Sequence, residues 1–322
     1  MGNSAGDLVL CSASIEAAVS ARFGGSVTRV RHRASGVDVL WHTPWADSAA
    51  EPPAGEALGV EAWCDHSRGG WQVALPNAGD DVMWRGTRHG FHGEASMAAW
   101  EVVTADPASV TLALELTTMP VRAERRITVA GETVTVEDSL ANFSDAPVEL
   151  MWTQHPGLGG DLLGGPVTIA TNARTVDLDD SAAVVGADVA PGQAGAWPHV
   201  GGTDFRHPRE GTAMLGYLHE FDGDPWVTVT RDDGSIGVRL SWEAATYPHC
   251  WLWEELGGTA GPPWNGLARV IGVEPATSWP GRGLATVAAT TRTAYRIDAY
   301  GTATGAVTLS VAVPAESDGG RS

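Results

Sequence analysis

The sequence contains no lysine, so all 20 of its basic residues are arginine. A lysine Schiff base, a pyridoxal-phosphate anchor and a phosphate-loop lysine are therefore excluded as mechanisms. The arginines are outnumbered by 39 acidic residues, which gives the chain a formal net charge of −19. A chain this acidic lacks the basic face that binds nucleic-acid phosphates or an anionic membrane surface, so neither is expected as a partner.

Cysteine and long apolar segments are also scarce. The three cysteines, Cys11, Cys64 and Cys250, lie far apart, which gives neither a zinc-binding spacing nor a disulfide framework. No run approaches 18 apolar residues, so no segment is expected to span a membrane. Residues 1–14 lack a basic stretch followed by an apolar one. We therefore expect no signal peptide and a cytoplasmic protein.

Strand patterns dominate what is present. Forty glycines and 19 prolines are typical of many short strands joined by turns. Apolar and polar residues alternate at 110–118 and 307–313, and a further strand is predicted at 148–152. Hairpins are predicted at 125–140, turning at Ala130-Gly131, and at 226–242, turning at Asp233-Gly234. Only residues 14–21 suggest a turn of helix. We predict one all-β domain over residues 1–322, with residues 1–6 and 316–322 frayed.

Tryptophan is unusually common, with 14 residues against five phenylalanines and four tyrosines. An indole offers an apolar face to the C–H side of a pyranose and an N–H group to a hydroxyl. Large β cores also absorb tryptophan, so both interpretations stay open. Several members of the set lie in stretches rich in glycine and proline: Trp71, Trp84, Trp251, Trp253, Trp264 and Trp279.

Three segments join reactive side chains to glycine-rich turns, at residues 69–100, 151–160 and 251–280. Each places a histidine or glutamate where a strand runs into a turn, which is a common position for sites on rigid β scaffolds. The glycine run at 157–165 lacks phosphate-loop spacing and is predicted to be a flexible rim.

The order of the motifs in these segments resembles divergent members of the aldose 1-epimerase (galactose mutarotase-like) family. The motifs are GGWQ, PNAG and FHGE before residue 95, TQHPG around His155, and IGVEPATSWPG around Glu274. The resemblance covers roughly residues 20 to 310. It implies a β-supersandwich of two large twisted antiparallel sheets, a small sugar as partner, and no cofactor or metal.

The resemblance also implies roles for three side chains. Glu274 would be the base at O1 of the sugar, His155 the acid at the ring oxygen O5, and His92 a hydrogen-bonding partner near O5. Interconversion of α and β anomers needs these groups, because O1 must lose a proton while O5 gains one before the ring opens. The open-chain carbonyl then recloses from its other face.

The binding residues follow less directly from the resemblance. The family carries an arginine ahead of its first histidine motif, whereas here that segment reads PNAGDD. Arg85 and Arg88 follow shortly after and could reach back. Glu254 is the preferred second acidic contact among Glu220, Asp222, Glu254 and Glu255. The predicted substrate-binding residues are Asn77, Asp80, Arg85, Arg88, Trp253, Glu254 and Trp71.

Alternatives to this interpretation remain. His89, His92 and Glu94 could be read as zinc ligands, although a distant partner motif is missing. His155, placed before Pro156, could simply end a strand. A hexose-phosphate mutarotase would use Arg85 and Arg88 as a phosphate clamp. A lyase or deglycosidase on the same scaffold, or a non-catalytic sugar-binding module, would also account for the tryptophans. The sequence leaves the oligomeric state open.

Overall fold

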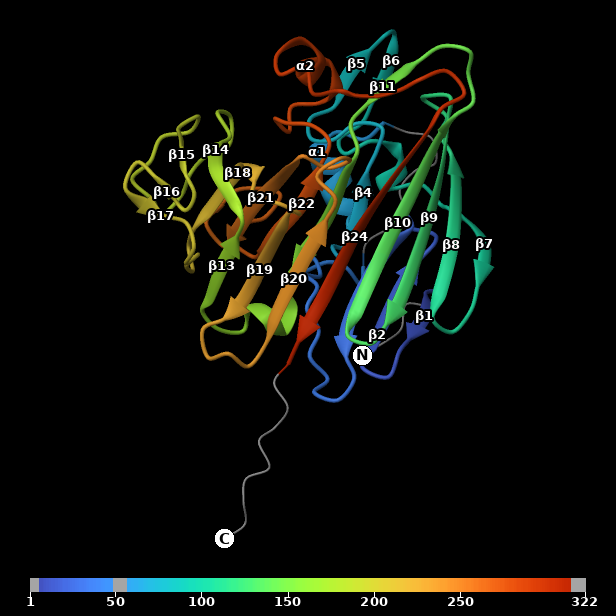
Figure 1. The fold of residues 1–322 in the computed structure, drawn as a ribbon. Helices are drawn as coiled ribbons and strands as arrows, with labels where there is room; N and C mark the ends of the chain where they lie inside the picture. Colours follow the sequence, from blue (N-terminus) through green and yellow to red (C-terminus); the bar gives the residue numbers. More distant parts are fainter. Residues whose placement is uncertain (1–5, 49–56, 314–322) are drawn as a thin grey trace.

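The computed structural model describes residues 6–48 and 57–313, and antiparallel strands dominate them. Figure 1 shows two large twisted sheets packed face to face. The predicted all-β class with large antiparallel sheets is therefore confirmed. The ends expected to be frayed lie almost wholly outside the described residues.

The first sheet has ten strands in the order β1-β2-β3-β4-β12-β22-β21-β18-β14-β15. It carries the site described below. Its strands are β1 (Leu8–Cys11), β2 (Ile15–Ser20), β3 (Ser26–His32), β4 (Trp71–Ala74), β12 (Thr153–Leu158), β14 (Ala173–Leu178), β15 (Ala194–Ala196), β18 (Ala213–Phe221), β21 (His249–Leu256) and β22 (Arg269–Ala276).

The second sheet has eight strands in the order β13-β19-β20-β24-β10-β9-β8-β7 and backs the first. In β9 and β10, buried residues alternate strictly with half-buried or exposed ones, as in a sheet with one solvated face. Its strands are β7 (Glu101–Ala105), β8 (Ser109–Glu115), β9 (Val121–Ala130), β10 (Thr133–Asn142), β13 (Val167–Thr171), β19 (Trp226–Arg231), β20 (Gly237–Trp242) and β24 (Thr302–Ala312).

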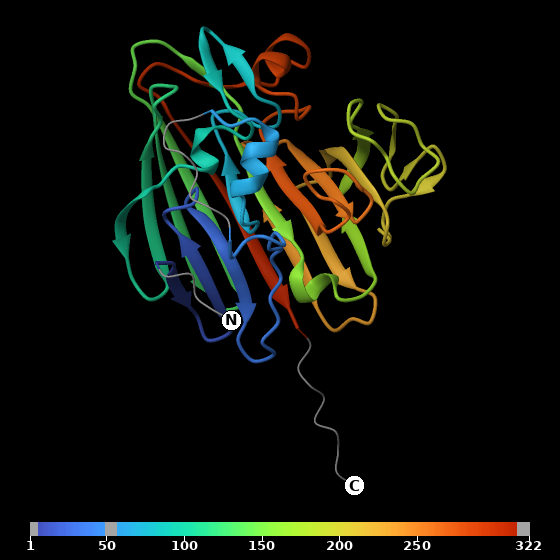
Figure 2. The same ribbon diagram turned by 180° about the vertical axis from the view of Figure 1, so that it is seen from behind.

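Shorter elements gather around the sheets. Figure 2 shows α1 on the face of the ten-stranded sheet that is turned away from the eight-stranded one. No helix in the described part of the chain is long and apolar enough to cross a membrane. These elements are α1 (Val60–His66), α2 (Leu284–Ala289), the 3-10 helices η1 (Glu94–Ser96) and η2 (Gly160–Leu163), and the strand pairs β5 (Val82–Trp84) with β6 (Thr87–His89), β11 (Val148–Leu150) with β23 (Tyr295–Ile297), and β16 (His199–Val200) with β17 (Thr203–Asp204).

Most predicted strands are confirmed. The hairpin of β9 and β10 turns at Gly131, whose φ of 55° favours glycine, and β19 pairs with β20. The helical turn expected at residues 14–21 is wrong, because these residues form β2, paired with β1 and β3. Pairing and burial of small residues override a weak local signal here. The glycine run at 157–165 ends β12 and forms η2.

A buried polar cluster lies between the two sheets. Arg125 of β9 binds Asp138 of β10 through Nε at 3.0 Å. Its Nη2 donates to Oε1 of Gln154 on β12 at 2.6 Å. Because successive side chains of a strand point to opposite faces, His155 must point away from the eight-stranded sheet.

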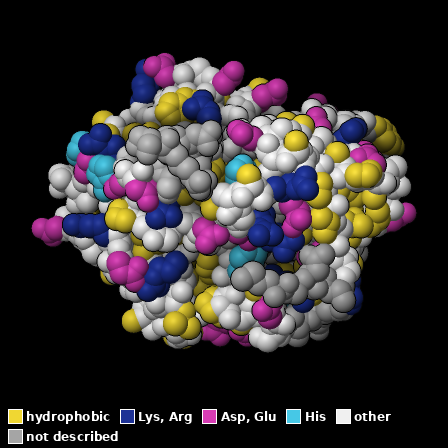
Figure 3. Space-filling model, turned by 90° about the horizontal axis from the view of Figure 1, so that it is seen from below, with side chains coloured by type: hydrophobic (Ala, Val, Ile, Leu, Met, Phe, Trp, Pro, Cys, Tyr) yellow, Lys and Arg dark blue, Asp and Glu magenta, His cyan; other side chains and the backbone are white. Residues whose placement is uncertain are grey.

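The surface carries charges of both signs. On the face shown in Figure 3, arginine side chains lie interspersed with aspartate and glutamate. That face therefore offers no continuous basic surface.

Candidate active site

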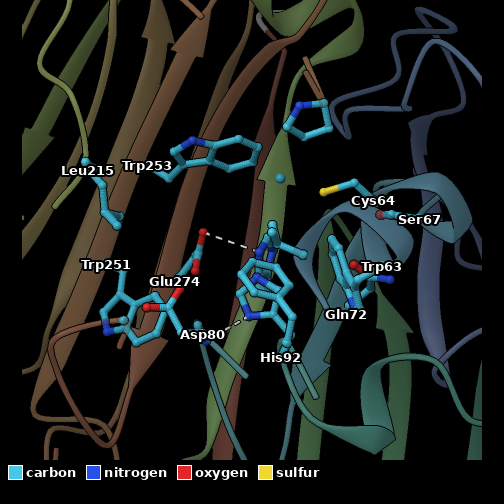
Figure 4. A pocket seen from close by; sticks show the side chains of 18 of the residues that line it. Trp63, Cys64, Ser67, Gln72, Asp80, His92, Leu215, Trp251, Trp253 and Glu274 are labelled. Carbon is cyan, nitrogen blue, oxygen red and sulfur yellow. Dashed lines mark hydrogen bonds and ion pairs between the residues drawn. The ribbon is translucent and has the colours of Figure 1, made fainter. Parts of the chain in front are cut away.

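Strand register places His155 and Glu274 side by side. In the pairing of β12 with β22, Thr153 faces Ala276 and Gly157 faces Gly272, so His155 falls opposite Glu274. Directly opposed residues of antiparallel strands share one face. Nε2 of His155 lies 3.7 Å from Oε1 of Glu274, and this contact is drawn in Figure 4. An imidazole and a carboxyl group are thus paired on the outer face of the ten-stranded sheet.

His92 reaches the same place from the loop after β6. Its backbone adopts a left-handed conformation with φ of 56°, and its ring centroid lies 4.7 Å from that of His155. Nδ1 of His92 accepts a hydrogen bond of 3.2 Å from the backbone N–H of Gly79. A neutral imidazole that accepts at Nδ1 carries its proton on Nε2. His92 can therefore donate to a ligand.

Glycines form the sheet surface beside this trio. Gly157 and Gly272 face each other, each two residues from His155 or Glu274 on the same strand. Trp253 of β21 is paired with Gly272. A Cβ atom on Gly272 would lie 2.5 Å from Oε1 of Glu274. The space next to the carboxyl group therefore exists because no side chain fills it.

The result is a cavity of about 280 Å³. It is small for a ligand site, and so suits a monosaccharide-sized molecule better than an oligosaccharide. Besides the trio, its polar side chains include Gln72, Asp80, Asp179 and Ser181, and its aromatic ones are Trp41, Trp63, Phe91, Trp251, Trp253 and Trp264.

Burial shifts the pKa values of the central groups toward their uncharged forms. It raises the pKa of Glu274 well above its usual range and lowers the pKa of His155 to about 4. Burial, together with the neighbouring His155, also holds the pKa of His92 well below its ordinary value. In all three groups, burial therefore favours the uncharged form, which is a carboxylic acid for Glu274 and a neutral imidazole for each histidine.

A family model described as a domain of unknown function (DUF4432) matches residues 15–311. The chain belongs to this family. No curated protein matches the sequence.

Solved structures with the same fold include mutarotase relatives. Slr1438 from Synechocystis sp. PCC 6803 is similar with a TM-score of 0.69 and 18% identity over 98% of this chain and 100% of that one. The GalM/aldose epimerase homologue from C. elegans gives 0.65 and 13% over 96% and 99%. A galactose mutarotase-like protein from Lactobacillus casei ATCC 334 gives 0.62 and 12% over 95% and 100%. The galactose mutarotase-like fold implied by the motifs is thus confirmed for this DUF4432 member.

Two of the predicted binding residues line the cavity of this DUF4432 chain, and two others are buried beside it. Asp80 and Trp253 are lining residues. Trp71 points to the inner face of the sheet, where its indole N–H donates to Gln154 at 3.0 Å. Asn77 is fully buried and ties loops together, donating to two backbone carbonyls and accepting from the N–H of Leu284. Trp71 and Asn77 therefore support the site from outside it.

The remaining three lie elsewhere. Arg85 and Arg88, at the β5–β6 hairpin, are exposed and pair with Glu149 at 2.6 Å and Asp81 at 2.8 Å. Glu254 points to the opposite face of the sheet from Trp253, where its carboxyl group accepts a hydrogen bond from the hydroxyl group of Thr212. Burial raises its pKa to about 7. None of the three is among the residues that line the cavity.

The zinc-ligand alternative finds no support in the geometry. Both carboxylate oxygens of Glu94 accept hydrogen bonds from Thr117 and Thr118, which turns this side chain toward the loop after β8. Within residues 6–48 and 57–313, no group of three or more His, Cys, Asp and Glu side chains is arranged to hold a metal ion.

The lining residues that sequence reasoning missed include Asp179 and Trp63. Burial alone would raise the pKa of Asp179. Hydrogen bonds from Ser181, Tyr217 and Ala182 outweigh that effect and lower its pKa. The residue is therefore a fixed negative charge at the cavity wall. For Asp179, the Asp-Asp-Ser turn at 179–181 was a local sequence pattern that could have indicated a fixed carboxylate. For Trp63, which lies on α1, the sequence contains no catalytic motif that could have indicated a place in the site.

Proposed function

We propose that the chain is an aldose 1-epimerase, which interconverts the α and β anomers of a free sugar. The observation that carries the proposal is the 3.7 Å contact between His155 and Glu274 inside a sugar-sized cavity. Family membership and fold alone do not specify this reaction, because one fold hosts many activities. The geometry of the site therefore decides the proposal.

The reaction needs two simultaneous proton transfers and no net change in proton number. Glu274 takes the proton of O1 while His155 delivers one to O5, the C1–O5 bond breaks and the C1–O1 double bond forms. After rotation about C1–C2 the steps run backward on the other face of the carbonyl carbon. His92, a donor through Nε2, supports the charge that develops at the ring oxygen.

The paired pKa shifts suit this exchange. A protonated carboxyl group beside a neutral imidazole holds one proton, the same number as a carboxylate beside an imidazolium. Because Glu274 and His155 are in contact, the proton can reside on either residue. Sugar hydroxyls that donate to Glu274 stabilise its carboxylate form and shift the proton to His155, which makes His155 the acid.

The alternatives are less well supported. A hexose-phosphate mutarotase needs an arginine or lysine clamp, yet Arg85 and Arg88 are bound to surface carboxylates. A sugar-binding module would need the indoles but not the acid–base pair, which is costly to bury. The location that we propose is the cytoplasm.

The test is a screen of freshly dissolved aldoses by polarimetry or saturation-transfer NMR, with sugar binding measured in parallel. We expect kcat to fall about 10²- to 10⁴-fold in Glu274→Gln and in His155→Ala, with a smaller effect on KM. His199→Ala, at an exposed histidine on β16, is the matched control and should retain full activity. Binding without any rate above buffer would instead identify a binding module, and equal losses in the control would discredit the assignment.

A further inference from the structure

Three polar side chains form a row across the outer face of the ten-stranded sheet. In the pairing of β4 with β12, Gln72 lies directly opposite His155. Glu274 lies opposite His155 on the other side, in the pairing of β12 with β22. Because directly opposed residues of antiparallel strands share one face, the row runs in the order Gln72, His155, Glu274. The proposed acid is therefore flanked by an amide and a carboxyl group.

The amide of Gln72 has unused hydrogen-bonding capacity. The side chain is only 4% exposed and lines the cavity. Its Nε2 donates to the backbone carbonyl of Ser96 at 3.5 Å, which is long for a hydrogen bond, and no group in the described part of the chain donates to its Oε1. An amide carries two donor hydrogens and an acceptor oxygen, so one donor and the acceptor remain for a ligand.

Ser67 adds a hydroxyl group to the same side of the cavity. It is buried at the C-terminal end of α1 and also lines the cavity. Its Oγ accepts a hydrogen bond of 3.3 Å from the N–H of Gly69, while its own O–H donates to no group among the described residues. Figure 4 shows Gln72 and Ser67 on one side of His92 and Glu274 on the other. Two uncharged polar groups thus lie at the end of the cavity away from Glu274.

The shape of a pyranose matches this row. In the chair form of a β-D-aldohexose, O1 and C6 are both equatorial, so the chain O1–C1–O5–C5–C6 is fully extended. Alternate atoms of an extended chain lie close to one line, which places O5 between O1 and C6. Under the proposed function, O1 lies at Glu274 and O5 at His155. C6 is therefore directed toward Gln72.

A hydroxymethyl group satisfies the polar groups at this end of the cavity. Its oxygen can accept a hydrogen bond from the amide of Gln72 or from the hydroxyl of Ser67, and its O–H can donate to Oε1 of Gln72. A 6-deoxyhexose or a pentose has no oxygen at this position. Either sugar would displace water from the buried amide without replacing its hydrogen bonds, which is costly.

We propose that Gln72, assisted by Ser67, selects the substituent at C5 of the sugar and binds the exocyclic hydroxyl O6 of an aldohexose. This inference rests on the proposed mutarotation and adds the residue that determines specificity at C5. The chemistry at O1 and O5 is unchanged, so no further reactant is needed.

The experiment compares sugars that differ only at C5: D-glucose with 6-deoxy-D-glucose and D-xylose, and D-galactose with D-fucose and L-arabinose. We expect the wild type to favour the hydroxymethyl sugar about 10- to 100-fold in kcat/KM in the better series, because the analogues leave a buried amide unpaired. A ratio near one in both series, or a preference for an analogue, overturns the inference.

Gln72→Met tests the residue directly, because methionine has a similar size but no amide. We expect kcat/KM for the hydroxymethyl sugar to fall about 10-fold or more, through a higher KM, and the ratio to the 6-deoxy sugar to approach one. Ser67→Ala should lower the same ratio by a smaller factor. Gln193→Met, at an exposed glutamine that is not among the lining residues, is the matched control. A wild-type ratio in Gln72→Met, or in Ser67→Ala if the first variant does not fold, contradicts the proposal.

Calorimetric binding to Glu274→Gln separates this inference from the proposed function. Suppose that the wild type turns over none of the six sugars. Tighter binding of the hydroxymethyl sugar, lost when Gln72→Met is added, would then refute mutarotation and still support the role of Gln72. Equal binding within each series, or binding of none of the six sugars, overturns the role of Gln72.

Discussion

Gln154 accepts a hydrogen bond of 2.6 Å from Arg125 of the opposite sheet, and the next residue along β12 is His155. Arg125 is also paired with Asp138, and all three side chains are buried. The amide of Gln154 in turn donates to Asp138 at 2.6 Å. The strand that carries the proposed acid is therefore fixed from behind by a buried ion pair.

Asp138→Ala should destabilise the protein strongly. Removal of one partner of a buried ion pair leaves an uncompensated charge, so we expect the free energy of unfolding to fall by about 3–5 kcal/mol. Urea denaturation followed by tryptophan fluorescence measures the change. Asp298→Ala removes an exposed carboxylate that pairs with Arg296, and its effect should lie within experimental error. A loss in Asp138→Ala no larger than in this control would contradict the account.

The alternation of apolar and polar residues along β9 could have predicted from the sequence that Arg125 is buried. Val121, Ala123, Arg125, Ile127 and Val129 occupy the inward positions of one strand, so the apolar pattern contains a single charge. Sequence patterning predicted the hairpins, because each depends on neighbouring residues. The motifs also singled out the histidines and the glutamate that the structure brings into one cavity.

Other parts of the site were beyond sequence reasoning. Asp179 and Trp63 reach the cavity only through pairings and packing between segments far apart in the chain. Trp71 and Glu254 belong to the right strands but point to the inner face, and Arg85 is held by a surface glutamate. Successive residues of a strand point to opposite faces of the sheet, so a strand residue lines the site only if its side chain points to the outer face. The composition of the sequence does not determine which face that is.

The pH dependence of kcat/KM should be broad. The His155–Glu274 pair holds its single working proton from a pH of about 4, where His155 gains a second proton, up to the raised pKa of Glu274. We expect half-maximal kcat/KM near pH 4, and constant kcat/KM from about pH 5.5 until the raised pKa of Glu274 is reached. Polarimetry with the buffer-catalysed rate subtracted measures the profile. An acidic limb centred near the ordinary histidine pKa would show that His155 is not perturbed in the working enzyme.

Glu274→Gln should stabilise the fold near neutral pH. Because burial raises the pKa of Glu274 above its usual 4.5, the unfolded chain releases this proton at a lower pH than the folded chain does. The contribution of Glu274 to stability is therefore largest at low pH and is lost as the pH rises above the ordinary value. The Gln variant lacks this loss, so its unfolding free energy should exceed that of the wild type at pH 7.5, and the difference should shrink toward pH 4.5. Glu149→Gln, at the surface, should show no such trend.

Gly272→Ala should lower activity without unfolding the sheet. The added Cβ would lie 2.5 Å from Oε1 of Glu274 and 3.2 Å from Cβ of Trp253, so the carboxyl group must move. A displacement of about 1 Å from the reactive geometry typically costs about 10²-fold in rate, and we expect a loss of that order in kcat/KM. Gly261→Ala, where a Cβ meets no atom within 4 Å, is the matched control and should behave as wild type. Full activity in Gly272→Ala, with its thermal stability retained, would mean that the position of Glu274 does not limit the reaction, and the carboxyl group would lose its role as the base at O1.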